Sequence, residues 1–209
     1  KYRHAYGSPV AFDHHGKTLI ATLKTDGLVI LNAENGSTVS FQKWETSYRT
    51  NSTTPIVRGD KIFVSTGYRR GCALFQFKGG SLNLLYENKH LSNHMNNSVL
   101  VGDYLYGFDG NVHMAGPKDF VCLKFSSGEP QWRNKSNLQV GSLIVVNNHL
   151  IVLGQRGELA IAPASPKGFS PIVREQVIGG RCWTSPVLAN GLLYLRNARG
   201  DLTCLDLRG

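Results

Sequence analysis

Short apolar runs alternate with polar turns along the chain, and the stretch 55–86 shows the pattern most clearly. Apolar or β-branched runs occupy 55–57, 61–65, 72–77 and 82–86, and the turns between them contain Gly or Asp. Short runs rich in strand formers and bounded by such turns are typical of β-strands. The stretch therefore predicts a unit of four antiparallel strands.

The same order returns near the end of the chain. Runs at 186–188, 192–195 and 202–205 are separated by the turn Asn190-Gly191 and by a polar loop. Asn-Gly favours a two-residue hairpin turn because both residues tolerate positive φ. No stretch of a dozen residues carries the apolar period of a helix, so we expect almost no helix.

A polar–aliphatic step opens each unit and gives the chain its period. The steps are Ser8-Pro9-Val10, Thr54-Pro55-Ile56, Asn97-Ser98-Val99, Gly141-Ser142-Leu143 and Ser185-Pro186-Val187. Their central residues lie 46, 43, 44 and 44 positions apart. A period in the forties with several short strands per unit is typical of a β-propeller. One four-stranded sheet cannot cover its own faces, so we expect neighbouring sheets to pack against each other as blades.

The predicted fold is all-β, a β-propeller of four-stranded antiparallel blades, with about five blades in one domain over 1–209. The repeats fall at about 5–48, 49–92, 93–136, 137–180 and 181–209. The last repeat stops at its third strand, and Lys1-Tyr2-Arg3-His4 resembles the end of a fourth strand. Five blades could close by strand exchange, but we expect an arc or fragment of a seven- or eight-bladed ring.

Composition adds few constraints. With 41% hydrophobic and 18% charged residues the chain has an ordinary globular composition. No apolar run reaches the length of a membrane span, and the opening residues lack the apolar core of a signal peptide. We expect a mature form or a fragment. Cys122 and Cys204 occupy the third-strand position that Ile30 and Ile161 fill in other repeats, so we expect both to be small buried hydrophobes.

Several motifs resemble one known repeat. They are Thr184-Ser185-Pro186-Val187, the strand 191–195, the stretch 200–206, and the two third-strand endings 31–36 and 123–128, which lead to Trp44 and Trp132. An aliphatic strand, an Asp-x-x-Thr-Gly-like turn and a Trp on the outer strand resemble the pyrroloquinoline-quinone-like (PQQ-like) β-propeller repeat family. The resemblance covers essentially the whole chain.

That family has catalytic and non-catalytic branches, and the resemblance is to the second. The non-catalytic branch includes the outer-membrane assembly lipoprotein of Gram-negative bacteria. The catalytic dehydrogenases carry adjacent cysteines over a quinone, whereas no two cysteines are neighbours here. The resemblance therefore implies a non-enzymatic bacterial binding or scaffolding platform, in the periplasm or cell envelope, with no cofactor.

Two other functions stay open. The chain could be a fragment of a PQQ-dependent quinoprotein alcohol dehydrogenase, in which case it would need PQQ with calcium. It could also be a sensor domain that reads a ligand for an attached module. We expect no catalytic residues, because no Gly-x-Ser-x-Gly elbow is present.

The net charge of +9 points to an anionic partner. In a propeller, the loops between second and third strands and those between successive blades open on one face. Those loops are predicted to hold twelve of the 23 lysines and arginines, together with His94 and His113. The twelve are Lys24, Arg49, Arg69, Arg70, Lys89, Lys118, Arg133, Lys135, Arg156, Arg181, Arg196 and Arg199. A generally basic, solvated surface would explain the same pattern.

Seven residues are the candidate ligand or partner contacts: Arg69, Arg70, His94, Arg181, Trp183, Arg196 and Arg199. Trp183 is singled out because it precedes an inner strand beside Arg181, whereas Trp44 and Trp132 occupy the structural outer-strand position. His90 and His94 have a metal-like spacing but lie in a loop, so we expect no metal site. We expect a protein partner or anionic ligand, no nucleic acid and no transmembrane segment.

Overall fold

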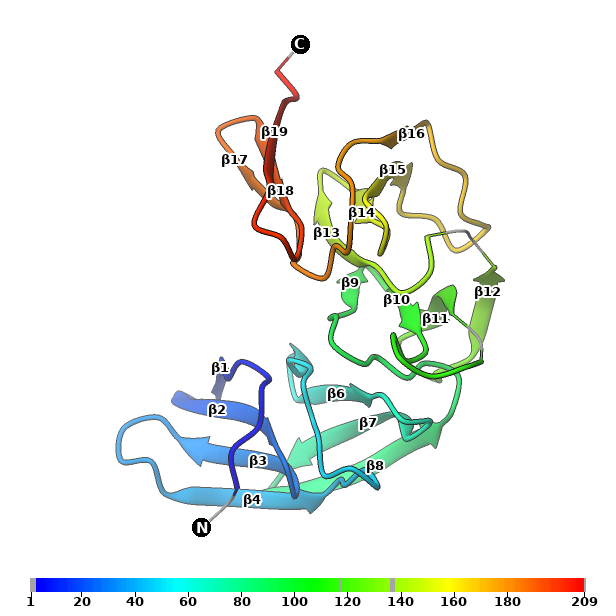
Figure 1. Ribbon diagram of the computed structural model, residues 1–209. Coiled ribbons are helices and arrows are strands. Elements are labelled where there is room, and N and C mark those ends of the chain that lie inside the picture. Colours follow the sequence, from blue (N-terminus) through cyan, green and yellow to red (C-terminus); the bar gives the residue numbers. More distant parts are fainter. Residues whose placement is uncertain (1–2, 117, 136–137, 209) are drawn as a thin grey trace. The chain divides into compact units, whose positions relative to one another are not determined.

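The computed structural model describes residues 3–116, 118–135 and 138–208 (Figure 1). Every regular element in these ranges is a β-strand and none is a helix, as predicted. Accordingly, none of the described residues belongs to a helix with the length and hydropathy of a membrane span. Of the predicted fourth-strand end, Lys1 and Tyr2 lie outside the described residues, and Arg3 and His4 belong to no strand.

The chain divides into two compact units. Unit 1 comprises Lys1–Met95 and Phe125–Glu129, and unit 2 comprises Asn96–Lys124 and Pro130–Gly209. Unit 1 holds two sheets and unit 2 holds three. The sheets match the five predicted repeats, whereas one domain over the whole chain stays a prediction.

Each sheet of unit 1 is a four-stranded antiparallel meander in which strands pair in chain order. The first contains β1 (Val10–His14), β2 (Lys17–Lys24), β3 (Gly27–Asn32) and β4 (Thr38–Lys43). The second contains β5 (Ile56–Arg58), β6 (Lys61–Thr66), β7 (Gly71–Lys78) and β8 (Ser81–Asn88). The predicted runs of the stretch 55–86 therefore become four neighbouring strands.

Unit 2 continues the same meander through three sheets. The first contains β9 (Val99–Val101), β10 (Tyr104–Asp109), β11 (Asp119–Lys124) and β12 (Pro130–Asn134). The second contains β13 (Ser142–Val146), β14 (His149–Leu153), β15 (Glu158–Pro163) and β16 (Val173–Gln176). The third has three strands, β17 (Val187–Ala189), β18 (Leu192–Arg196) and β19 (Leu202–Asp206).

Neighbouring sheets bury apolar side chains against each other, and this places the core between them. In unit 1 one buried cluster joins Leu23 and Ile30 of the first sheet to Ile62 and Phe75 of the second. In unit 2 one cluster joins the first two sheets and another joins the last two. Fully burying one such side chain contributes about 1.5–3 kcal/mol. Each of these buried clusters needs side chains from two sheets, as the repeat pattern predicts.

A register shift between the third and fourth strands recurs in three of the sheets. It falls between Ile30 and Leu31, between Leu74 and Phe75, and between Cys122 and Leu123. These are matching repeat positions, so the irregularity belongs to the repeat itself. An extra residue on one strand increases the local twist of a sheet.

One burial prediction is wrong. Cys122 is fully buried in β11, but Cys204 is exposed in β19. Leu202 and Asp206, which share its side of the strand, are exposed too. The third sheet of unit 2 has a described neighbour on only one side, so its other face stays uncovered. The same strand position is therefore buried or exposed according to whether a second sheet packs on it.

Candidate functional site

Four loops of unit 2 meet at one end of its sheets. They follow β10, β14, β16 and β18, which makes three of them loops between second and third strands and one a connection between sheets. The N–H of Cys182 donates to the carbonyl of Gln155 (2.8 Å), and the N–H of Ala198 donates to that of Arg181 (2.8 Å). The predicted gathering of these two loop types is thus present within unit 2.

The loops surround a pocket of about 460 Å³, called the Trp183 pocket below. This volume is in the range of small-ligand sites. Its lining residues come from three of the four loops: His113, Gln155, Arg156, Gly180, Arg181 and Trp183.

The loop after β14 is held rigidly by its backbone. Besides accepting from Cys182, Gln155 donates its N–H to the carbonyl of Leu138 (2.9 Å). Gly157 has φ +88°, and a Cβ there would meet the carbonyl oxygen of Ile178 at 1.8 Å. Only glycine allows that close approach. The side chain of Gln155 therefore starts from a fixed backbone position.

The loop after β16 is tied to the loop after β18 through Asn197. Its Nδ2 donates to the carbonyl of Gly179 (2.8 Å) and to Asp201 Oδ2 (2.6 Å). Its Oδ1 accepts the N–H groups of Arg199 and Asp201. Asn197 is itself buried. This network fixes the wall of the pocket on which Gly180 lies.

Trp183 has aromatic and cationic neighbours but lacks a hydrogen-bond partner. Arg181 Cζ lies 4.5 Å from the centroid of its ring, and His113 meets the ring edge-on at 5.3 Å. No described residue accepts a hydrogen bond from its buried Nε1, and none donates one to the buried Oε1 of Gln155. A buried polar atom without a partner costs about 1–3 kcal/mol. The pocket residues therefore carry an unused donor and an unused acceptor.

The pocket is positively charged. Arg156 and Arg181 line it, and no described lining residue is acidic. Within the described ranges, neither guanidinium forms an ion pair with a carboxylate. Nearby Arg199 is 3.4 Å from Asp201, and both are well exposed. The charge of the pocket is thus open to an anion.

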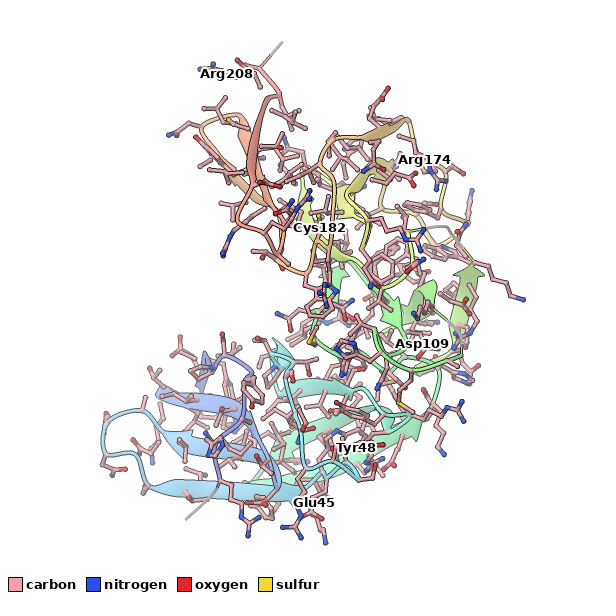
Figure 2. All side chains as sticks on the ribbon, viewed as in Figure 1. Glu45, Tyr48, Asp109, Arg174, Cys182 and Arg208 are labelled. Carbon is pink, nitrogen blue, oxygen red and sulfur yellow. The ribbon has the colours of Figure 1, made fainter. Side chains whose placement is uncertain are left out.

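Cys182 lies beside this pocket, in the loop between β16 and β17 (Figure 2). Burial raises the pKa of its thiol. A thiol with a raised pKa stays protonated and unreactive at neutral pH. Cys182 therefore has a packing role in the buried cluster next to Trp183.

Unit 1 holds a second group of candidate residues at the turn between β6 and β7. Tyr68 and Arg69 both have left-handed φ, 59° and 57°, and the N–H of Arg70 donates to the carbonyl of Gly67 (3.1 Å). Tyr68 packs on Tyr48 at 4.5 Å, and its hydroxyl is 3.1 Å from His94 Nε2. These contacts hold a conformation that non-glycine residues rarely adopt.

Arg70 is committed to neighbours within unit 1. Its guanidinium lies 3.5 Å from the centroid of the Trp44 ring, and its Nη1 is 2.6 Å from Glu87 Oε1. Trp44 Nε1 donates to Thr66 Oγ1 (2.9 Å). These contacts give Arg70 a structural role, and a ligand contact by it stays a prediction.

The structure places the seven candidates in two groups. Arg69, Arg70 and His94 belong to unit 1, and Arg181, Trp183, Arg196 and Arg199 belong to unit 2. Arg181 and Trp183 line the pocket. Arg196 is the exposed last residue of β18, and Arg69 is exposed on its turn. A single face that joins both groups stays a prediction.

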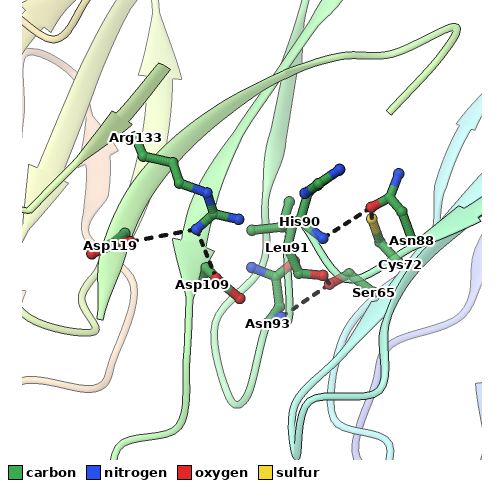
Figure 3. Close-up of polar contacts among 9 residues, drawn as sticks. All are labelled: Ser65, Cys72, Asn88, His90, Leu91, Asn93, Asp109, Asp119 and Arg133. Atoms are coloured by element: carbon green, nitrogen blue, oxygen red, sulfur yellow. Dashed lines mark hydrogen bonds and ion pairs between the residues drawn. The ribbon is translucent and has the colours of Figure 1, made fainter. Parts of the chain in front are cut away.

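Some basic residues have structural partners instead. Arg133, predicted in a loop, lies in β12, and its Nη1 is 2.9 Å from Asp109 Oδ2 and 3.4 Å from Asp119 Oδ2 (Figure 3). In unit 1 the backbone N–H of His90 donates to Asn88 Oδ1 at 3.0 Å (Figure 3). In the ranges described, no three His, Cys, Asp or Glu side chains form a group that could hold a metal ion.

Sequence reasoning missed two residues of the pocket altogether, Gln155 and Gly180. Gln155 was not singled out, because a glutamine in a polar loop carries no pattern. Arg156 and His113 were counted among the basic loop residues but not among the candidate contacts. The fixed spacing of loops between second and third strands is the signal that could have brought them together with Trp183.

Comparison with known proteins supports the repeat assignment. The model of the family described as outer membrane protein assembly factor BamB matches residues 5–134. The chain belongs to this family. No curated protein sequence matches it.

Solved structures share the fold of this family member at low sequence identity. BamB from Moraxella catarrhalis is 19% identical, with a TM-score of 0.68 over 96% of this chain and 58% of that one. The quinohemoprotein alcohol dehydrogenase ADHIIG from Pseudomonas putida HK5 is 11% identical, with a TM-score of 0.69 over 98% and 40%. The designed protein Ika8 is 7% identical, with a TM-score of 0.64 over 97% and 58%. The chain thus spans well under two thirds of each.

Proposed function

We propose that this PQQ-like repeat protein is a non-enzymatic binding platform outside the cytoplasm, in the bacterial periplasm or cell envelope. It uses its basic loops to hold a protein partner or anionic ligand. The family described as an outer membrane assembly factor supports a protein partner. The observation that carries the proposal is the Trp183 pocket, whose arginines have no carboxylate partner among the described residues.

Site-specific photocrosslinking in cells tests the platform. A photoreactive phenylalanine analogue replaces Arg69 or Arg199, both exposed in loops between second and third strands. Lys78, exposed beside the turn between β7 and β8, serves as the control because third-to-fourth strand turns lie at the opposite end of a blade.

Under the proposal, the two loop positions crosslink to the same partner protein and the control position does not. No adduct from either loop position, or adducts from Lys78 alone, would contradict a platform that uses these loops. Both results are read by mass spectrometry of the purified adducts.

The dehydrogenase fragment is the competing function, and the fold likeness to a quinohemoprotein alcohol dehydrogenase is the observation that keeps it in view. The protein is incubated with PQQ and calcium, and alcohol-dependent reduction of a dye is followed by absorbance. We expect no turnover, because the sequence lacks adjacent cysteines. Sustained turnover would contradict the non-enzymatic platform and support the dehydrogenase fragment.

A further inference from the structure

The Trp183 pocket has a pattern of polar atoms that specifies more than negative charge. Trp183 Nε1 is a donor and Gln155 Oε1 is an acceptor, and both are buried without a partner among the described residues. Arg156 and Arg181 line the same pocket. A ligand that satisfies all four groups must carry an acidic oxygen and an N–H or O–H donor near each other.

The donors favour a carboxylate. The guanidinium of Arg181 lies over the Trp183 ring, so both donors belong to one small group of side chains. A carboxylate has two oxygens and can accept from the indole and from an arginine together. A phosphodiester or a fully ionised phosphate monoester could accept as well, but neither carries an O–H that could donate to Gln155 Oε1.

The acceptor favours a peptide. In a peptide, every aspartate or glutamate residue has a backbone N–H a few bonds from its carboxylate. Such a residue offers both complementary groups at once. The rigid backbone of Gln155, held on both its N–H and its carbonyl, suits an acceptor that must keep its position.

We propose that the Trp183 pocket binds an aspartate or glutamate residue in an acidic segment of the partner protein. The carboxylate accepts from Trp183 Nε1 and the arginines, and a backbone N–H of the segment donates to Gln155 Oε1. The assignment rests on the proposed function, because it names the chemistry by which the platform recognises a protein.

Fluorescence anisotropy tests this with a labelled peptide of alternating glutamate and serine, blocked at both ends. The matched peptide has glutamine in place of every glutamate. We expect the acidic peptide to bind about tenfold more tightly or better, since hydrogen bonds to charged groups are the stronger ones. The titrations are run at low salt, because screening weakens such contacts.

Three variants assign the binding to the pocket. Trp183→Phe keeps a ring but removes the N–H, and should weaken acidic-peptide binding about tenfold. Gln155→Met keeps the side-chain length but removes the acceptor, and should weaken it about three- to tenfold. Lys124→Gln removes an exposed charge at the end of β11, outside the pocket, and should change binding less than about twofold. Circular dichroism and urea unfolding confirm that each variant is folded.

Defined results overturn the assignment. Equal affinity for both peptides would show that the carboxylate is not recognised. Unchanged affinity in folded Trp183→Phe and Gln155→Met would show that the peptide does not bind in the Trp183 pocket. If free glutarate competes as strongly as the peptide, the pocket recognises a small acid and the peptide assignment is wrong. In each case a photocrosslinked partner would still support the proposed binding platform. Absence of any crosslinked partner at both loop positions would instead contradict the proposed function itself.

Discussion

Trp44 and Trp183 each carry an arginine on the indole ring, but the two pairs differ in burial and in how many of their polar groups have partners. Trp44 is almost fully buried, and its N–H donates to Thr66 Oγ1. Its arginine is further held by Glu87. Trp183 is half-buried; in the described ranges its N–H has no acceptor and Arg181 forms no ion pair with a carboxylate.

The difference separates structure from binding better than residue type does. Where every polar group has a partner within the protein, a Trp–Arg pair is explained by stability alone. Where donor and acceptor remain unused, hydrogen bonding within the protein does not account for the arrangement, and the proposed ligand would. The predictions below test whether the two tryptophans really divide in this way.

Truncating the two rings should give the largest contrast. Trp44→Ala removes a buried ring that packs edge-on against Phe75 at 6.3 Å, and should lower the free energy of unfolding by about 3–5 kcal/mol. Trp183→Ala removes a half-exposed ring and should cost about 1–2 kcal/mol. Urea unfolding followed by far-ultraviolet circular dichroism measures both. Equal losses would mean that Trp183 is as structural as Trp44.

Removing polar groups without removing the rings should give a smaller contrast, in which the Trp183 change can even be stabilising. Thr66 Oγ1 accepts from Trp44 and donates to Asn51 Oδ1 (3.0 Å), so Thr66→Val strands two buried groups and should cost about 1–3 kcal/mol. Trp183→Phe removes an N–H that has no partner, so the change should stay within about 0.5 kcal/mol or be stabilising. A large loss in Trp183→Phe would reveal a partner inside the folded protein.

Much of the fold could be read from the sequence because it depends on local and repeated features. The turn Asn190-Gly191 falls between two strands as predicted, and the apolar runs become strands. Cys204 shows the limit. Its position in the repeat matches that of buried Cys122, but burial depends on a neighbouring sheet that no local pattern reports.

The site could be read only in part, for a related reason. Trp183 and Arg181 are close in sequence and were both candidate contacts, and the structure places the Arg181 guanidinium over the Trp183 ring. Arg70 on Trp44 and Gln155 near Trp183 bring together residues that lie 26 and 28 positions apart. Such contacts depend on loop conformation. Tyr68 and Arg69 have left-handed φ, which bulky residues rarely adopt, so their sequence carried no sign of this turn.

Replacing the two arginines should give the smallest contrast and a salt signature. Arg70→Gln removes a ring contact and an ion pair that is partly exposed, and should cost about 1 kcal/mol, from contributions of about 0.5–1 kcal/mol each. That loss should shrink between about 0.05 M and about 0.5 M sodium chloride, because salt screens the exposed ion pair. Arg181→Gln should cost at most about 0.5 kcal/mol, with little dependence on salt. The Trp183 ring that Arg181 contacts is half-exposed, and no carboxylate in the described ranges pairs with Arg181. Urea unfolding at both salt concentrations measures this. If Arg181→Gln proves the more destabilising change, Arg181 stabilises the fold, and it would no longer be a group held open for a carboxylate.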